Sequence, residues 1–437
     1  MAEYRARLID RQLKEELKAF GAVVIVGPKW CGKTTTAKQL AKSILYMQDP
    51  AKRETYMQMA KLDPSNLLAG ENPRLIDEWQ TAPRLWDAVR FDVDMRNEQG
   101  LYILTGSTSI RDKDKDKDKD KDKDKEENGD SILHSGAGRI VRMRMRTMSL
   151  YEYGDSTGDV SLGKLFSNAN KVSGHSKMSI GDAARSIVRG GWPSSVRMED
   201  DIAQRQVAGY CETILESDIT TVDGKRRDPQ KMRAILRSLS RNVSTSVKNA
   251  TVLDDIYSDR TDMHENTLND YIDALRRIYV IEDLPAWGPK LRSKTVIRTS
   301  DTRHLTDPAI AAYFLGASAK DLEFDPNTFG LLFESMAVRD LRVYAQSLGG
   351  DVYHYRDKED LEADAVIHLR NGKWAAVEVK LGDDQINDAA KNLKKLRDKV
   401  DTEKMNKPSF LAVVTGTEYA YTRDDGVHVI PIGCLKD

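Results

Sequence analysis

Apolar residues in the first part of the chain follow two alternating patterns. Short apolar runs, AVVIVG, RLIDEW, LYILTG and IVRMRM, are separated by longer stretches with the spacing of helices. Strands that alternate with helices are typical of a parallel sheet covered by helices. The pattern therefore predicts an α/β domain at 1–155.

The middle of the chain reads as two smaller helical units. Residues 156–227 contain a Gly-, Ser- and Asn-rich stretch, the turn sequence GGWPSSV and a long helical stretch, which we interpret as a helical lid. Residues 228–299 contain three helical segments, followed by an extended stretch with Pro285, Gly288 and Pro289. This order of elements predicts a small winged-helix domain.

The last part of the chain, 300–437, predicts a second mixed α/β domain. A helix is expected at 329–346 and an amphipathic helix near 384–399, among the apolar runs VYHYR, ADAVIHL, WAAVEVK and FLAVVT. Several domains are expected in a chain of 437 residues, because one domain usually contains about 100 to 200.

A charged insertion interrupts the first predicted domain at 112–130. Seven consecutive Asp-Lys pairs at 112–125 are followed by EENGD, and no apolar residue in the segment could anchor it to a core. We predict a solvated surface loop. A DNA-mimicking or ATP-sensing role is the alternative, which the cancelling charges disfavour.

Composition limits the class of protein. Hydrophobic residues make up 40% and charged residues 31% of the chain, and no apolar run reaches the roughly 18 residues of a membrane span. The N-terminal segment has the spacing of an amphipathic helix rather than of a signal peptide, and three widely spaced cysteines form neither a zinc quartet nor a disulfide framework. We therefore expect a cytoplasmic protein with no membrane partner. Since the net charge is −1, any DNA contact depends on local basic patches.

The sequence GPKWCGKT at 27–34 lies between an apolar strand and a helical stretch. In this G-x-x-x-x-G-K-[ST] pattern, the two glycines allow the loop to turn its backbone N–H groups toward phosphates. Lys33 reaches the β and γ phosphates of ATP, and Thr34 ligates Mg²⁺. The predicted nucleotide-binding residues of this loop are Gly27, Pro28, Lys29, Trp30, Cys31, Gly32, Lys33, Thr34 and Thr35.

Two further strand ends carry polar residues. RLIDEWQ ends in Asp77, which can hold the Mg²⁺ shell, and Glu78, which can orient or deprotonate the attacking water. An exposed acidic pair in a loop is the alternative. LYILTGS places Thr105 and Ser107 where a polar sensor could touch the γ-phosphate, although a strand cap explains them nearly as well.

Several arginines follow the charged insertion. Arg139 lies on a Gly-flanked turn in HSGAGRI and is a candidate arginine finger, which in a homo-oligomer would reach the nucleotide of a neighbouring subunit. A solvated arginine at a strand start is the alternative. Arg142, Arg144 and Arg146 alternate with apolar residues, so one face of this strand is basic and could contact DNA or an acidic partner. A half-exposed strand explains that alternation equally well.

Taken in order, these motifs resemble a known family. Nearly the whole chain is covered by GPKWCGKTT, LIDEWQ, LYILTGSTS, GAGRI with SLYEY shortly after, GGWP, ETILESDI, TLNDYIDALRRIYVIEDLPAW, ESMAVRDL, EADAVI and VEVK. The chain resembles bacterial and archaeal P-loop ATPases of AAA type that carry a C-terminal restriction-endonuclease-like domain of unknown function. The resemblance implies an ATPase core, a helical and winged-helix middle and a nuclease-like end.

A candidate nuclease site lies in the last predicted domain. Asp364 lies in ADAVIHL, and Glu378 and Lys380 lie in WAAVEVKL. Because side chains alternate along a strand, Glu378 and Lys380 share a face, and an adjacent strand can bring Asp364 beside them. The two carboxylates could then bind Mg²⁺ while the ammonium supports the attacking water or the phosphate charge. The resemblance adds Glu334 and Gln385 as supporting polar residues. The alternative is a scaffold with a salt-bridged Glu-Lys pair.

Two basic patches suggest DNA contacts through phosphate. Arg233, Arg237 and Arg241 have i, i+4, i+8 spacing on one predicted helix face, although a solvated face explains them equally well. The second patch, in the predicted wing, consists of Lys290, Arg292, Lys294 and Arg298.

The sequence therefore predicts an Mg²⁺-dependent ATPase whose nucleotide cycle controls a DNA-binding, nuclease-like module, with ATP as substrate. The alternative, from a different class, is a nucleotide-dependent switch or scaffold whose C-terminal domain binds a partner without cutting.

Overall fold

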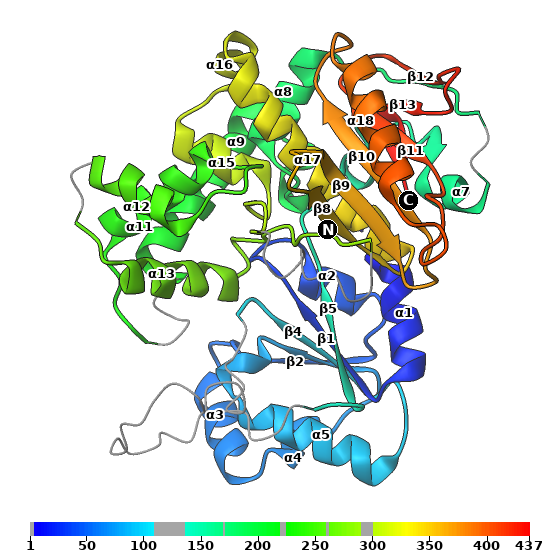
Figure 1. Ribbon diagram of the computed structural model, residues 1–437. Helices are drawn as coiled ribbons and strands as arrows, with labels where there is room; N and C mark the ends of the chain where they lie inside the picture. Colours follow the sequence, from blue (N-terminus) through cyan, green and yellow to red (C-terminus); the bar gives the residue numbers. More distant parts are fainter. Residues whose placement is uncertain (1–3, 109–135, 169–170, 219–223, 259–261, 290–299) are drawn as a thin grey trace. The chain divides into compact units, whose positions relative to one another are not determined.

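The computed structural model describes residues 4–108, 136–168, 171–218, 224–258, 262–289 and 300–437 (Figure 1). Contacts divide the chain into two compact units. The first contains Met1–Arg146 with Arg277–Tyr279, and the second contains Thr147–Arg276 with Val280–Asp437. The predicted charged insertion at 112–130 lies outside the described residues. None of the described helices is long and apolar enough to cross a membrane.

The first unit is built on a five-stranded parallel sheet with the order β2-β3-β4-β1-β5. Its strands are β1 (Ala22–Val26), β2 (Ser43–Tyr46), β3 (Arg74–Asp77), β4 (Tyr102–Gly106) and β5 (Ile140–Arg144). Its helices are α1 (Ile9–Ala19), α2 (Lys33–Lys38), α3 (Arg53–Leu62), α4 (Ser65–Leu68) and α5 (Arg84–Arg96). The predicted α/β class is confirmed.

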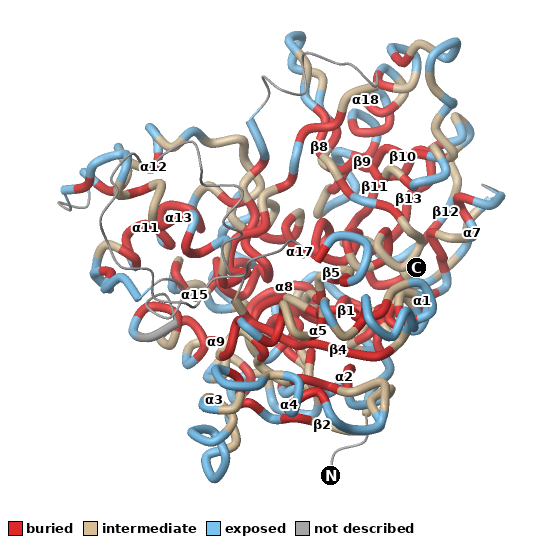
Figure 2. The backbone as a smooth tube through the Cα atoms, turned by 90° about the horizontal axis from the view of Figure 1, so that it is seen from below, coloured by how far each residue is buried: buried red, intermediate tan, exposed pale blue. Residues whose placement is uncertain are grey.

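Both faces of this sheet are buried, which explains why its strands read as continuous apolar runs. Alternate residues of β1 enter different cores, Ala22 and Val24 on one face and Val23 and Ile25 on the other. Residues of α3, α4 and α5 pack in the first of these cores, and residues of α1 and α2 pack in the second. Figure 2 shows the buried backbone of β1 and β4.

The second unit combines helices with a seven-stranded mixed sheet in the order β7-β12-β13-β11-β10-β9-β8. The strands of this sheet are β7 (Gly174–His175), β8 (Gly350–Arg356), β9 (Glu362–Leu369), β10 (Trp374–Lys380), β11 (Leu411–Thr415), β12 (Tyr419–Thr422) and β13 (His428–Pro431). Strands β6 (Val160–Ser161) and β14 (Leu435–Lys436) form a separate two-stranded sheet. Strands β8, β9 and β10 are antiparallel neighbours, whereas β10, β11 and β13 run parallel. The parallel pairing of β10 with β11 needs a crossover connection, which is the helix α18 (Ile386–Lys399).

Helices make up most of the remainder of the second unit. In sequence order, the first of these helices are α6 (Leu150–Tyr153), α7 (Leu162–Ser167), α8 (Ile180–Arg189), α9 (Asp200–Thr213), α11 (Pro229–Arg241), α12 (Asn249–Ser258), α13 (Glu265–Arg277), α15 (Pro308–Leu315) and α16 (Ala319–Phe324). The longest described helix, α17 (Pro326–Ser347), starts with proline at its first position behind the capping side chain of Asp325. Helix α18 (Ile386–Lys399) packs its apolar face in the core of the mixed sheet.

The observed division into two units differs from the predicted boundary at residue 155. Strand β6 pairs with β14, and β7 pairs with β12, so the segment that follows β5 belongs to the sheets of the second unit. These pairings join residues more than 200 positions apart, and a local apolar pattern carries no information about them. The second unit therefore begins at Thr147.

The region predicted as a winged helix has three helices, α11, α12 and α13. They are followed by antiparallel bridges between Ile281 and Leu305 and between Leu284 and Thr302. The predicted wing patch, Lys290 to Arg298, lies outside the described residues.

A buried ionic network holds several elements of the second unit together. Arg339 on α17 lies 3.2 Å from Asp307 and 2.7 Å from Asp340, and all three side chains are almost completely buried. Asp307 also accepts hydrogen bonds from the Thr147 hydroxyl at 2.7 Å and from the backbone of Ala309 at 3.0 Å. Burial raises the pKa of Asp340 to about 6, against the opposing effect of Arg339. The network thus joins the start of the unit to α15 and α17.

We expect Arg339→Gln to destabilise the second unit by about 3–5 kcal/mol, because it leaves two buried carboxylates without their cation. Chemical denaturation followed by circular dichroism measures the change. The matched control is Arg237→Gln on the exposed face of α11, which should shift stability by less than about 0.5 kcal/mol. Equal stability of the two variants would contradict the role given to the network.

Candidate functional site

The predicted P-loop connects the end of β1 to the start of α2. Gly27 has φ 152°, and a Cβ there would lie 2.1 Å from the carbonyl oxygen of Met145, so no larger residue fits. Gly32 has φ 104°, which also favours glycine. Trp30 adopts φ 64° although it has a side chain, and that side chain is 56% exposed. The tight turn of the loop therefore depends on glycine at positions 27 and 32.

Lys33 lies inside this loop. Its side chain is buried, and its ammonium donates hydrogen bonds to the carbonyl oxygens of Gly27 at 3.0 Å and Pro28 at 2.8 Å. The buried charge is thus paired only with neutral acceptors in these two bonds. A phosphate oxygen would be a stronger partner, because hydrogen bonds between charged groups are roughly twice as strong as neutral ones.

Asp77 connects two other predicted site residues. Its Oδ1 accepts hydrogen bonds from the hydroxyls of Thr34 at 2.7 Å and Thr105 at 2.6 Å. Asp77 and Thr105 are register partners at the carboxyl ends of β3 and β4, and β4 lies between β3 and β1. The parallel sheet therefore delivers both residues to the edge where the P-loop begins.

Glu78 follows Asp77 in a left-handed conformation with φ 56°. Its Oε2 accepts hydrogen bonds from the amide of Gln80 and from the hydroxyl of Ser107 at 3.4 Å. Gln80 was not among the predicted site residues. Its position two residues after the carboxylate, in LIDEWQ, is the signal that could have identified it.

The remaining predicted nucleotide-site residues lie farther from this cluster of contacts. Thr35 is exposed on α2, and Lys29 is half-buried in the loop. Arg139 lies at the amino end of β5, where its carbonyl accepts from Ala22 and its guanidinium pairs with Asp94 at 2.6 Å. That is the opposite edge of the sheet from the P-loop. The structure therefore does not bring Arg139 to the nucleotide site of its own chain, and a role in a neighbouring subunit stays a prediction.

The three residues of the candidate nuclease site converge in the second unit. Asp364 on β9 and Glu378 on β10 both pair with the ammonium of Lys380, at 3.3 Å and 2.8 Å. Asp364 also accepts a hydrogen bond from the backbone of Val379 at 2.7 Å, which fixes it against β10. The neighbouring antiparallel strands produce this arrangement, as the spacing of the residues predicted.

Protons can balance part of the charge of this cluster. Burial, and then the nearby charge of Asp364, raise the pKa of Glu378 to about 8 and the pKa of Glu334 above its usual range. Burial alone would lower the pKa of Lys380, but Asp364 and Glu378 raise it. At neutral pH a proton on Glu378 removes one negative charge from beside the ammonium of Lys380. Protonation of Glu378 therefore offsets part of the negative charge of the cluster.

The predicted supporting residue Gln385 is exposed, unlike the three central residues. It lies just before α18. Across the described segments, no group of three or more His, Cys, Asp or Glu side chains is arranged to hold a metal ion.

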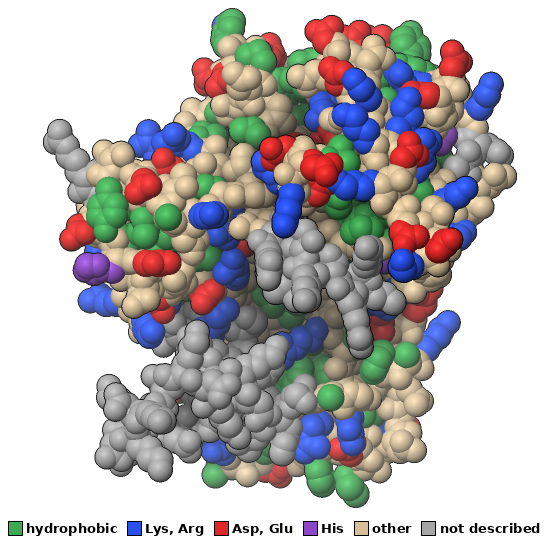
Figure 3. Space-filling view, in the orientation of Figure 1, with side chains coloured by type: hydrophobic (Ala, Val, Ile, Leu, Met, Phe, Trp, Pro, Cys, Tyr) green, Lys and Arg blue, Asp and Glu red, His purple; other side chains and the backbone are tan. Residues whose placement is uncertain are grey.

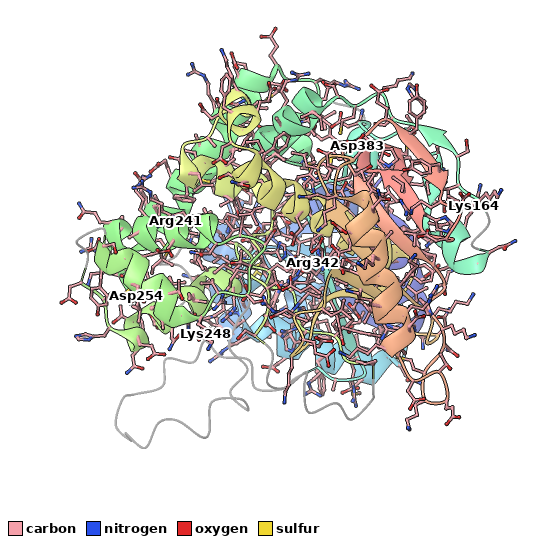
Figure 4. The ribbon with its side chains drawn as sticks, turned by 45° about the horizontal axis from the view of Figure 1, so that its top comes forward. Lys164, Arg241, Lys248, Asp254, Arg342 and Asp383 are labelled. Carbon is pink, nitrogen blue, oxygen red and sulfur yellow. The ribbon has the colours of Figure 1, made fainter. Side chains whose placement is uncertain are left out.

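The predicted basic face of α11 is partly neutralised by acidic partners. Arg233 pairs with Glu212 at 2.8 Å, and Arg241, labelled in Figure 4, pairs with Asp255 at 3.1 Å. Figure 3 likewise shows Lys and Arg interspersed with Asp and Glu over the face in view. Arg237 is exposed between the two pairs. The arrangement is closer to a solvated helix face than to a continuous phosphate-binding surface.

Three segments of the chain match protein-family models. Residues 19–122 match an AAA domain, and residues 180–321 and 329–435 match two domains of unknown function, DUF8612 and DUF4143. No curated protein matches the chain. Among solved structures, the Walker-type ATPase PABY2304 of Pyrococcus abyssi is 13% identical, with a TM-score of 0.39, over 70% of this chain and 94% of that one.

The AAA match spans the P-loop and the carboxyl ends of β3 and β4. The first unit therefore contains a P-loop ATPase domain of AAA type, and this part of the resemblance is confirmed. The C-terminal match is to a domain of unknown function, so the restriction-endonuclease-like interpretation stays a prediction.

The raised pKa of Glu378 predicts a pH dependence of stability. Its pKa rises from an ordinary 4.5 to about 8 on folding, so the folded chain holds a proton that the unfolded chain releases, and the stability that this proton contributes is lost as pH rises through that range. Glu378→Gln stays uncharged, so its thermal unfolding midpoint should fall by a few degrees less than that of the wild type between about pH 5 and 8. The exposed control Glu403→Gln should behave like the wild type. Parallel curves for all three proteins would rule out proton uptake at Glu378.

Proposed function

We propose that the protein is an Mg²⁺-dependent ATPase whose nucleotide cycle controls a DNA-binding, nuclease-like module. The observation that carries the ATPase part is the convergence of Thr34 and Thr105 on one oxygen of Asp77, beside the buried ammonium of Lys33. A structural turn would need neither the paired hydroxyls nor the buried charge, because burying polar groups costs free energy unless they are satisfied.

Binding of ATP would exchange the partners of Lys33. The ammonium would leave the carbonyl oxygens of Gly27 and Pro28 for the phosphates, where its charge is opposed by the negative charge of the transferred group. The hydroxyl of Thr34 and the carboxylate of Asp77 are hard oxygen donors only 2.7 Å apart, a donor set that suits Mg²⁺. When bound there, Mg²⁺ would neutralise charge on the phosphate oxygens.

Glu78 is the residue best placed to orient the attacking water. Ser107 and Gln80 hold its Oε2, which leaves the carboxylate fixed in direction rather than free to rotate. An oriented carboxylate can accept a hydrogen bond from water and then its proton as the bond to phosphorus forms. Thr105 at the end of β4, which donates to Asp77, would act as the sensor that contacts the γ-phosphate.

Two substitutions separate binding from hydrolysis. Lys33→Ala should weaken ATP binding and reduce turnover at least about 100-fold, because the main side-chain charge on the phosphates is lost. Glu78→Gln should keep ATP bound and lose turnover to a similar extent, because only the water loses its acceptor. Equilibrium binding of a fluorescent ATP analogue and phosphate release measure the two effects.

Exposed residues of the first unit give matched controls for these variants. Lys61→Ala and Glu71→Gln make the same chemical changes outside the site and should keep the wild-type rate. Unchanged turnover in Lys33→Ala would refute the ATPase proposal, and equal loss of binding in both site variants would assign Glu78 a structural role.

For the second unit, we propose metal-dependent DNA cleavage at Asp364, Glu378 and Lys380. Support comes from their convergence, since packing alone does not require two carboxylates and an ammonium at one place. Metal binding would have to displace both the proton of Glu378 and its pairing with Lys380. The alternative is a module that binds a partner without cutting, which the raised pKa of Glu378 favours, because a protonated carboxyl group is a poor metal ligand.

A cleavage assay separates these two proposals. Wild-type protein with ATP and Mg²⁺ or Mn²⁺ should nick duplex or single-stranded DNA, and Lys380→Ala should lose nicking at least about 100-fold while keeping ATP turnover. Lys395→Ala, an exposed change on α18, should nick like the wild type. If the wild type cuts neither DNA and calorimetry finds no metal binding that depends on Asp364, the non-cleaving alternative stands.

A further inference from the structure

A short N-terminal arm reaches the P-loop from outside the matched AAA segment, which begins at residue 19. In this arm Arg7 is 7% exposed, and its guanidinium donates two hydrogen bonds to backbone carbonyls. One goes from Nη1 to Cys31 in the P-loop at 2.9 Å, and the other from Nη2 to Arg146 at 3.0 Å. Arg7 thus connects the P-loop to the point where the chain leaves the first unit.

Hydrogen bonds within the arm and to α2 also hold the arm in place. The carboxylate of Asp10 accepts hydrogen bonds from the Tyr4 hydroxyl, at 2.7 Å and 2.9 Å, and from the backbone of Arg7 at 2.9 Å. The Tyr4 hydroxyl is also 3.0 Å from that of Thr36 on α2. Since the phenol has one proton and Asp10 takes it, Thr36 donates to Tyr4. The arm is therefore attached to the helix after the loop as well as to the loop itself.

The bond from Arg7 to Cys31 determines how one peptide group of the loop is turned. In a planar trans peptide the carbonyl and the following N–H point in opposite directions. Because the carbonyl of Cys31 points toward Arg7, the N–H of Gly32 points away from it. The Cys31 thiol lies 3.6 Å from the carbonyl oxygen of Met145, so the same residue is also held by the residue that follows β5. With Cys31 held on both sides, the peptide has little freedom to flip.

We propose that Arg7 is a positioning residue for nucleotide binding, which holds the Cys31–Gly32 peptide with its N–H available to a phosphate. This inference rests on the proposed ATPase function. A phosphate needs several N–H groups aimed at one place, and a peptide that flips presents a carbonyl oxygen to the anion instead. Arg7 fixes the orientation of this peptide before ATP binds. The free energy needed to order the peptide is therefore spent in folding and does not weaken ATP binding.

The test measures nucleotide affinity with and without the guanidinium. In the full chain, Arg7→Ala should bind a fluorescent ATP analogue roughly ten-fold more weakly, the effect of one hydrogen bond to a charged group. Millimolar methylguanidinium should restore affinity in Arg7→Ala, since it can occupy the same place between the carbonyls, and should have no effect on Lys33→Ala. Turnover at saturating ATP should stay within about three-fold of the wild type, because Arg7 is proposed to act through the Cys31 carbonyl and not on the reacting groups.

Two further variants complete the test. Lys14→Ala, an exposed change on α1, should bind like the wild type. Arg7→Lys should bind at least about three-fold more weakly, because an ammonium lacks the planar fork that spans two carbonyls, and this variant also serves if Arg7→Ala does not fold. Wild-type affinity in Arg7→Lys, or a loss in Arg7→Ala that methylguanidinium does not restore, would overturn the inference. If the wild type itself binds no nucleotide, the ATPase proposal is refuted, and the inference about Arg7 is refuted with it.

Discussion

One oxygen of Asp77 accepts hydrogen bonds from Thr34 and Thr105, and the nucleotide site depends on the strand register that makes this possible. Asp77 pairs with Thr105 across β3 and β4, and Thr105 pairs with Ile25 across β4 and β1. A slip of one residue would turn one partner to the opposite face of the sheet. The alternate burial of strand residues in two separate cores opposes such a slip, so the same apolar packing that stabilises the sheet also aligns the site.

The second unit contains two buried ionic clusters of different character. Around Arg339 the carboxylates of Asp307 and Asp340 accept backbone hydrogen bonds from Gly191, Ala309 and Leu150, so the charges join distant segments of chain. Around Lys380 a single backbone N–H takes part, and part of the excess charge is offset by the raised pKa of Glu378. The first cluster has the properties of a structural brace. A group that changes protonation near neutral pH is more typical of a functional site.

The local pattern of apolar residues predicted several strands and a helix correctly. It could not predict which distant segments of the chain pair with one another. The run AVVIVG became β1, LYILTG became β4, and the expected helix at 384–399 became α18. The short strands β6 and β7 were missed because their partners lie more than 200 residues away, and so was the start of the second unit. In the site, Asp77, Glu78 and Thr105 followed from strand ends, but Gln80 did not. No motif describes a side chain whose role is to orient another.

The same reasoning explains why Arg7 escapes sequence analysis. Its acceptors are the backbone carbonyls of Cys31 and Arg146. Because every residue has a backbone carbonyl, the residue types at these two positions do not reveal the contact. It also matters where the second acceptor lies. The carbonyl of Arg146 belongs to the peptide that precedes Thr147, whose hydroxyl donates to Asp307 in the buried network. Arg7 therefore holds the last residue of the first unit's main segment as well as the P-loop.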